Sequence, residues 1–259
     1  MIKIKILTVG DIVGKIGLQK LKEVLPNIIK ENNIDFVIVN GENAADGMGL
    51  TEKMYREMLA IKVDVVTMGN HTWAKKEVFG FIDDKQIVRP ANYPKSVPGK
   101  GYDIYECKNK KIAVINLLGR VTMPVQVENP FLEARNIVND IKDKVDIIII
   151  DFHGEATAEK IAIGYYLDGE VTIVFGTHTH VQTSDETILE KGTGYITDIG
   201  MTGPKKSVIG MDIESSLKRF ETSLPERYKT AEGVGMFNSC MFEVDDNTNK
   251  VIEITRINM

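Results

Sequence analysis

All four histidines of this 259-residue chain lie in short polar clusters, and each cluster directly follows an apolar run typical of a β-strand. Five such clusters occur along the chain: Gly10-Asp11-Ile12-Val13-Gly14, Asn40-Gly41-Glu42-Asn43, Gly69-Asn70-His71, Asp151-Phe152-His153-Gly154-Glu155 and Gly176-Thr177-His178-Thr179-His180. Taken singly, each cluster is also compatible with an ordinary helix cap, loop or turn. Chance would place some of the histidines on helix faces or surface turns, so the joint pattern indicates one functional site.

Carboxylate, amide and imidazole groups together form a ligand set suited to borderline metals such as Fe, Mn, Zn or Ni. His178 and His180 stand two residues apart, so one loop can present both imidazoles to metal ions. The two cysteines, Cys107 and Cys240, are far apart and lack metal-ligand spacing, which argues against a closed thiolate zinc site. A carboxylate can bridge two ions about 3.5–4 Å apart, and such a pair activates water and neutralises charge on a phosphoryl group. The ligand inventory therefore indicates phosphoester hydrolysis.

The elements that must position these clusters alternate between apolar runs and helical patterns, which is typical of a layered α/β fold. The predicted strands that precede the clusters are Ile2–Val9, Asp35–Val39, Val63–Met68, Val145–Ile150 and Val171–Phe175. The predicted helices are Ile16–Glu31 with an interruption at Pro26, a helix capped by Thr51 that runs to Ala60, a helix near Lys75–Ile82, Phe131–Ile141 and Glu155–Leu167. Ligands of open α/β sheets bind beyond the carboxyl ends of the strands, so we expect the clusters to meet at one rim.

Two further segments are typical of antiparallel hairpins, Gly101–Cys107 with Lys111–Leu117 and Met236–Val244 with Val251–Ile257. A turn-rich connection from Arg89 precedes the first of them. The βαβ passages by themselves imply a central sheet with helices on both faces, and the hairpins imply mixed strand directions. No repeat or interdomain linker is evident, so we expect a single domain over residues 1–259.

Composition limits the classes of partner. The formal net charge is −5, which disfavours binding of extended nucleic acid because that binding relies on basic neutralisation of phosphates. No stretch approaches the roughly 20 apolar residues that span a bilayer, and the first residues lack the apolar segment of a signal peptide. We therefore expect a cytoplasmic protein that acts on a small substrate, with neither a membrane nor an extended nucleic acid as partner.

The order of the motifs, from Gly-Asp through Glu-Asn and Gly-Asn-His to Gly-Thr-His-Thr-His, resembles that of the calcineurin-like metallophosphoesterases. The usual pattern of that superfamily begins Asp-x-His and has Gly-Asp for its bridging carboxylate, whereas Val13 and Gly41-Glu42-Asn43 stand at those places here. These departures, together with Arg89–Pro94 and Asp198–Pro204, resemble a bacterial subgroup, the small 2′,3′-cyclic-nucleotide 2′-phosphodiesterases. The resemblance implies a layered α/β/β/α sandwich with mixed β-sheets.

The resemblance also implies roles for individual residues. Its first metal ion would be held by Asp11, Glu42, Asn43 and His180, with Glu42 as the bridge, and its second would be completed by Asn70, His153 and His178. His71 would be the general acid, a role that fits a histidine whose proton is acidified beside two cations. A metal-bound hydroxide would attack phosphorus in line with the departing 2′ oxygen. The cofactors would be two divalent or trivalent ions, with iron as our prediction and manganese or zinc as alternatives.

Several alternatives remain open at the level of sequence. The same scaffold could carry a phosphomonoesterase or a nuclease, or a non-catalytic regulator that binds a nucleotide, although a regulator would not need His71 as a proton donor. Trp73 could stack on a base or pack the loop that carries His71. Lys205 and Lys206 could contact phosphate or form a solvated turn. Homo-oligomerisation is compatible with a bacterial enzyme of this size, but no segment marks an interface.

Overall fold

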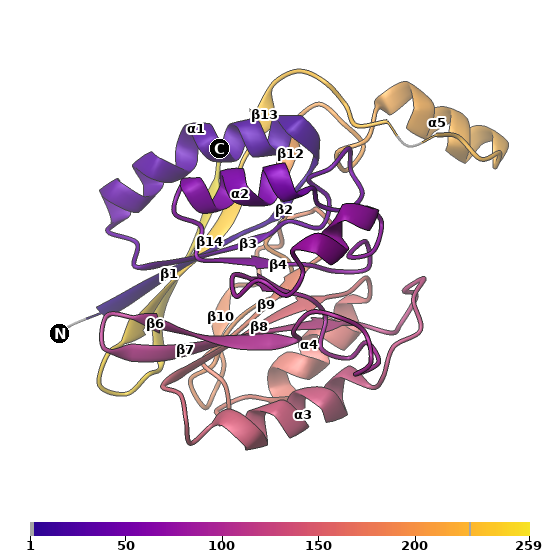
Figure 1. Ribbon diagram of the computed structural model, residues 1–259. Helices are drawn as coiled ribbons and strands as arrows, with labels where there is room; N and C mark the ends of the chain where they lie inside the picture. Colours follow the sequence, from indigo (N-terminus) through magenta and orange to yellow (C-terminus); the bar gives the residue numbers. More distant parts are fainter. Residues whose placement is uncertain (1–2, 228) are drawn as a thin grey trace.

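The strands form two six-stranded sheets that pack face to face, in a computed structural model that describes residues 3–227 and 229–259 (Figure 1). The first sheet has the order β15 (Val251–Asn258), β14 (Asn238–Asp245), β1 (Lys3–Val9), β3 (Phe36–Asn40), β4 (Val65–Thr67) and β5 (Ile87–Val88). The second has the order β10 (Thr187–Ile188), β11 (Gly194–Ile196), β9 (Ile173–Thr177), β8 (Ile147–His153), β7 (Lys110–Leu118) and β6 (Tyr102–Cys107). A small third sheet joins β13 (Gly235–Met236), β12 (Met201–Pro204) and β2 (Asp11–Ile12).

The long helices cover the outer faces of the two large sheets (Figure 1). Helices α1 (Gly14–Asn32) and α2 (Glu52–Ala60) lie on the first sheet, and α3 (Pro130–Ile141) and α4 (Thr157–Tyr166) lie on the second. The remaining elements are the 3₁₀ helix η1 (Lys76–Gly80) and α5 (Ile213–Thr222), which has no buried residue and protrudes from the body. This arrangement confirms the α/β/β/α sandwich with mixed sheets. The simpler expectation of one central sheet was wrong.

The central strands of both sheets are apolar on both faces, because each sheet lies between two layers of core. In β8, Ile147 and Ile149 face the core between the sheets, while Ile148 and Ile150 pack in the core under α3 and α4. Strand β3 divides its side chains in the same way between the inter-sheet core and the core under α1 and α2. Successive strand residues point to opposite faces, so each of these strands needs an apolar layer on both sides.

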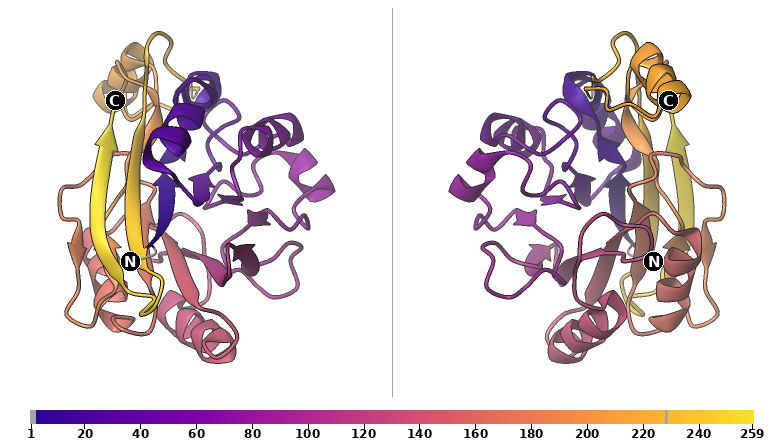
Figure 2. Two further views of the ribbon diagram at one scale, coloured as in Figure 1. Left: turned by 90° about the vertical axis from the view of Figure 1, so that its left-hand side faces the viewer. Right: turned by 90° about the vertical axis from the view of Figure 1, so that its right-hand side faces the viewer.

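The parallel strands bring the polar clusters to one end of the sandwich. Strands β1, β3 and β4 run parallel in the first sheet, as do β7, β8 and β9 in the second. The last residues of neighbouring strands are paired in register, Asn40 with Thr67 and His153 with Thr177. The closing hairpin β14–β15 pairs with β1 on its other side, and Figure 2 shows it in yellow along one edge of the molecule.

Local expectations were met with a few exceptions. Thr51 caps α2 by accepting a hydrogen bond from the N–H of Met54 at 3.3 Å, as expected. Helix α1 continues through Pro26, contrary to the predicted interruption. Pro26 and Lys22 are both exposed, so the Lys22 carbonyl freed by the proline faces water, while Leu21, Leu25 and Ile28 bury the other face.

Other differences concern short or peripheral elements. The helix predicted near Lys75–Ile82 is the single 3₁₀ segment η1. The strands β2, β5 and β10 to β13 and helix α5 were not predicted. Ile2, the predicted start of the first strand, lies outside the described residues. No helix in the described part of the chain is long and apolar enough to cross a membrane. One domain over residues 1–259 stays a prediction.

Candidate metal centre

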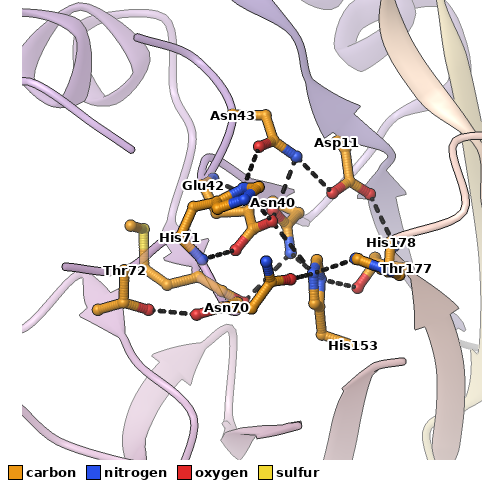
Figure 3. Close-up of polar contacts among 12 residues, drawn as sticks. Asp11, Asn40, Glu42, Asn43, Asn70, His71, Thr72, His153, Thr177 and His178 are labelled. Carbon is orange, nitrogen blue, oxygen red and sulfur yellow. Dashed lines mark hydrogen bonds and ion pairs between the residues drawn. The ribbon is translucent and has the colours of Figure 1, made fainter. Parts of the chain in front are cut away.

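All eight residues predicted for the site meet at the carboxyl rim of the sandwich. Figure 3 shows seven of them, all except His180. The segments that follow β1, β3 and β4 of the first sheet contribute five of them: Asp11, at the start of the short strand β2, and the loop residues Glu42, Asn43, Asn70 and His71. The end of β8 and the loop after β9 in the second sheet contribute the other three, His153, His178 and His180. The site therefore depends on how the two sheets face each other.

One group of ligand atoms surrounds the Nε2 atom of His153. Glu42 Oε1, Asn70 Oδ1 and His178 Nδ1 each lie 3.1 Å from it. His153 and Glu42 are fully buried, and His178 is largely so. Glu42, His153 and His178 place one ligand atom each within 4.8 Å of one another, a spacing that can hold a metal ion.

Two neighbours fix which nitrogen of His153 faces this group. The hydroxyl of Thr177 donates its only hydrogen to Asp151 Oδ1 at 2.7 Å, so it must accept from His153 Nδ1 at 2.9 Å. Nδ1 therefore carries a hydrogen, and Nε2 is the ring nitrogen that faces Glu42, Asn70 and His178. A ring held in this tautomer by a hydrogen bond behind it is typical of a metal-binding histidine.

A second group lies on the other side of Glu42. Asp11 Oδ1 and His180 Nε2 are 3.7 Å apart, and His180 donates its Nδ1 hydrogen to the carbonyl of Ile209 at 2.8 Å. The Asn43 Nδ2 atom lies 3.3 Å from Asp11 Oδ1, 3.2 Å from Glu42 Oε1 and 3.2 Å from His180 Nε2. Two amide hydrogens therefore face three acceptors. A ligand role for Asn43 requires the opposite amide orientation, with Oδ1 among these three atoms.

The donor set fits bound metal ions, as the motif resemblance implies. Both groups place carboxylate, amide and imidazole atoms at about hydrogen-bond distance with too few hydrogens to satisfy them, which is a favourable place for cations. Glu42 belongs to both groups because its Oε1 contacts His153 on one side and Asn43 on the other.

The electrostatics of the cluster point in the same direction. Burial alone would raise the pKa of the Glu42 carboxyl, but His153 and His71 outweigh burial and hold that pKa well below its ordinary value. Burial would lower the pKa of His153, yet Glu42 raises it to about 9. Burial, together with the charge on His153, lowers the pKa of His178 to about 3. The cluster thus holds a proton between Glu42 and His153, and a cation would take that proton's place.

His71 lies beside the cluster without completing either group. Its backbone N–H donates to Glu42 Oε2 at 2.8 Å, and its Nδ1 lies 2.8 Å from Asn43 Oδ1. The side chain is 29% exposed, and its Nε2 atom has no partner among the described residues. This position differs from that of the predicted ligands, since His71 has a ring nitrogen free to meet a substrate.

Gly69 is required by the packing of the site. A Cβ atom at this position would lie 2.3 Å from Glu42 Oε2 and 2.5 Å from His153 Nε2. Any side chain at residue 69 would therefore displace two of the central ligand atoms.

Supporting residues that the sequence did not single out lie within the same motifs. Asn40 accepts the Glu42 N–H at 3.2 Å and donates to Asp151 Oδ2 at 3.2 Å, and Glu155 Oε2 lies 3.2 Å from His178 Nε2. Together with Thr177, which contacts His153, these residues orient the predicted ligands through hydrogen bonds and an ion pair. Their places at the ends of β3, β8 and β9 were the available signal.

The two open questions on nearby residues have different outcomes. Trp73 packs between aromatic rings, with Phe79 stacked at 5.4 Å and Tyr93 edge-on at 5.8 Å, which favours the packing explanation. Lys205 and Lys206 are exposed, and neither side chain forms a hydrogen bond or ion pair with the cluster in the described part of the chain.

Comparison with known proteins agrees with this geometry. The 2′,3′-cyclic-nucleotide 2′-phosphodiesterase of Bacillus subtilis (strain 168) is 49% identical over 254 residues, which cover 98% of this chain and 96% of that protein. The crystal structure of a novel phosphatase from Mycoplasma pneumoniae matches with a TM-score of 0.95 and 39% identity, covering 100% of this chain and 94% of the other. A hypothetical protein from Thermus thermophilus matches with a TM-score of 0.94 and 38% identity, covering 99% of both chains.

These relatives confirm the resemblance to bacterial metallophosphoesterases and the prediction of a phosphoester hydrolase. The YmdB-like protein family matches residues 7–257, which is nearly the whole chain. With this match and a relative that shares almost half of its residues, the chain belongs to the YmdB-like family, whose fold is that of the metallophosphoesterases.

Proposed function

We propose that this protein hydrolyses 2′,3′-cyclic nucleotides by cleaving the ester to the 2′ oxygen, which would leave a nucleoside 3′-phosphate. The observation that carries the proposal is the position of Glu42 between two groups of ligand atoms, with His71 directly beside it. The 49% identity to the Bacillus subtilis phosphodiesterase supports the choice of substrate class.

The cofactor is a set of divalent metal ions, as the family implies. We propose two ions, one held by Asp11, Glu42, Asn43 and His180 and the other by Glu42, Asn70, His153 and His178. When bound, such a pair activates a water molecule and neutralises charge on the phosphoryl group. We propose iron as the metal, with manganese and zinc as the alternatives, because the donor set mixes carboxylate, amide and imidazole groups.

His71 would donate the proton that the departing 2′ oxygen needs. In the orientation that makes Asn43 a ligand, its Nδ2 would face His71 Nδ1, which would then accept a hydrogen bond. The proton for the substrate would therefore be held on Nε2, the partly exposed nitrogen. The His71 Nδ1 atom also lies 3.3 Å from Glu42 Oε1. Backbone contact with Glu42 Oε2 fixes the loop, so the ring stays next to the reacting group.

The proposal includes a small substrate, in line with the net charge of −5, and a cytoplasmic location. The same donor set would also serve a phosphomonoesterase or a nuclease. A catalytically silent nucleotide-binding regulator is a weaker alternative, because it would have no use for a proton donor placed like His71.

Side-by-side rates of the metal-loaded protein on a 2′,3′-cyclic nucleotide, a 3′-nucleotide, a nitrophenyl phosphate and RNA test the proposal. We expect the cyclic nucleotide to be the best substrate, with the 3′-phosphate as product by phosphorus NMR. A preference for the monoesters or RNA would overturn the assigned substrate. If the metal-loaded protein bound the cyclic nucleotide tightly but did not turn it over, the enzymatic function would be refuted in favour of the nucleotide-binding regulator.

A further inference from the structure

A buried ion pair lies behind the loop that carries His178 and His180. Lys160, in α4, and Asp198 are each about 1% exposed, and Lys160 Nζ lies 2.7 Å from Asp198 Oδ2. Neither residue belongs to the proposed ligand set. A buried pair generally gains little net stability, since desolvation of both charges offsets their attraction. Its contacts therefore need another explanation.

Asp198 holds the residue between the two histidines. Its Oδ2 atom accepts hydrogen bonds from the Thr179 N–H at 3.1 Å and from the Thr179 hydroxyl at 2.7 Å, while Oδ1 accepts the Gly200 N–H at 2.8 Å. Both carboxylate oxygens are thus used, and one of them receives every polar hydrogen that Thr179 offers. The middle of the His178-Thr179-His180 loop is tied to a single anion.

The loop needs these hydrogen bonds to Asp198 because its backbone is strained. His178 has a φ of 98° and His180 a φ of 65°, values that residues with a Cβ adopt only at a cost of about 1–3 kcal/mol each. These conformations direct the two rings to different groups, His178 toward His153 and His180 toward Asp11. A relaxed loop would not present both imidazoles in this way.

Gly176 leaves room for Lys160 and for the segment before Asp198 to pack against the histidine loop. A Cβ atom there would lie 1.8 Å from the carbonyl oxygen of Thr197 and 3.1 Å from Lys160 Cδ. The backbone before Asp198 and the stem of Lys160 therefore pack directly against the start of the histidine loop. The Ile199 N–H also donates to the Gly176 carbonyl at 2.9 Å, which fixes the two segments to each other.

We propose that Asp198 and Lys160 are positioning residues that hold the His178-Thr179-His180 loop in its strained form, so that its two imidazoles serve two different metal ions. Asp198 supplies the acceptors, and Lys160 supplies the counter-charge that lets a carboxylate remain buried there. The proposal rests on the proposed metal role of the two histidines, but not on the choice of phosphoester substrate.

Asp198→Asn tests the proposal because an amide keeps the shape but offers one oxygen in place of two. Either Thr179 or Gly200 then loses its acceptor and faces an N–H₂ group. We expect affinity for Co²⁺, measured by chelator competition on metal-stripped protein, to fall about 10–100-fold. The visible absorption of the cobalt-loaded variant should change as the ligand geometry changes.

Two further variants separate positioning from general stability. Lys160→Met with Asp198→Asn removes both charges, so we expect its thermal stability to recover relative to Asp198→Asn while its cobalt affinity stays low. Asp168→Asn is the matched control. Asp168 is a buried carboxylate that accepts the N–H groups of Lys191 and Thr193 away from the site, and its replacement should affect stability only.

Wild-type cobalt affinity and absorption in folded Asp198→Asn would overturn the proposal. So would a recovery of cobalt affinity in the double variant in parallel with its thermal stability. If Asp198→Asn does not fold, Thr179→Val serves in its place, because it removes only the hydroxyl contact. We expect it to lower the affinity for Co²⁺ by a smaller factor. Failure of the wild-type protein to bind cobalt would instead refute the metal site, and failure on cyclic nucleotides alone would refute only the substrate.

Discussion

Gly69→Ala is the sharpest test of the site, because it adds one methyl group at the centre of the ligand atoms. The added Cβ would lie 2.3 Å from Glu42 Oε2 and 2.5 Å from His153 Nε2. Ordinary contacts between such atoms begin near 3.4 Å, so Glu42 Oε2 would have to move by about 1 Å. Gly69 does not have a positive φ, so the effect would come from the neighbours alone.

Glu42 has no free space into which it can move. Its carboxylate is fully buried, and Oε2 accepts the His71 N–H at 2.8 Å while Oε1 lies 3.1 Å from His153 Nε2. A shift of this size moves the proposed bridge relative to both ligand groups, and about 1 Å of misplacement costs roughly 100-fold in rate. We therefore expect kcat to fall about 100-fold, together with weaker metal binding, while overpacking costs about 1–3 kcal/mol of stability.

The assay compares metal content by elemental analysis and turnover of a 2′,3′-cyclic nucleotide with those of Gly80→Ala. Gly80 is an exposed residue at the end of η1, and nothing lies within 4 Å of a Cβ built there, so this control should behave like the wild type. Folding of both variants is checked by circular dichroism. Wild-type metal content and a rate within about threefold of the wild type in Gly69→Ala would refute the geometry of the centre, since a methyl group cannot fit between those atoms.

Three further predictions follow from the same geometry. Protein prepared without chelator should contain close to two transition-metal equivalents per chain, and a value near zero in active protein would exclude the two-metal site. Glu42→Gln should lower metal affinity at both sites because it removes the charge of the proposed bridge, whereas Asn43→Ala should weaken only the first; full occupancy and turnover in Glu42→Gln would exclude the bridge. His71→Ala should keep both metals and lose about 10²–10⁴-fold on cyclic nucleotides but far less on a nitrophenyl phosphodiester, whose leaving group needs no proton. Loss of a metal would make His71 a ligand, and equal loss on both substrates would exclude the proton-donor role.

Residue types and their order along the chain were enough to predict which residues gather at the site. Each polar cluster follows an apolar run, and parallel strands end at one rim, so Asp11, Glu42, Asn70 and His153 could be brought together without coordinates. The motif order then specified the family, and with it the two-sheet sandwich. The apolar runs alone did not, because periodicity does not distinguish one doubly covered sheet from two stacked sheets.

Short elements escaped prediction for a related reason. Strands of two to four residues, such as β10 to β13, are too short to show alternation, and α5 buries no residue, so it has no core to give it a distinctive pattern. Their positions are decided by hydrogen bonds with distant segments, as when Met201 pairs with Asp11.

The orientation of the site residues depends on tertiary contacts that no local pattern contains. The tautomer of His153 depends on Thr177, which is 24 residues away, and the histidine loop depends on Asp198 and Lys160 from two other segments. Nothing in the sequence indicates that the amide nitrogen of Asn43 faces Asp11 while its oxygen faces His71. Residue type and spacing determine which atoms can bind a metal, whereas hydrogen-bond partners brought together by packing determine which way those atoms point.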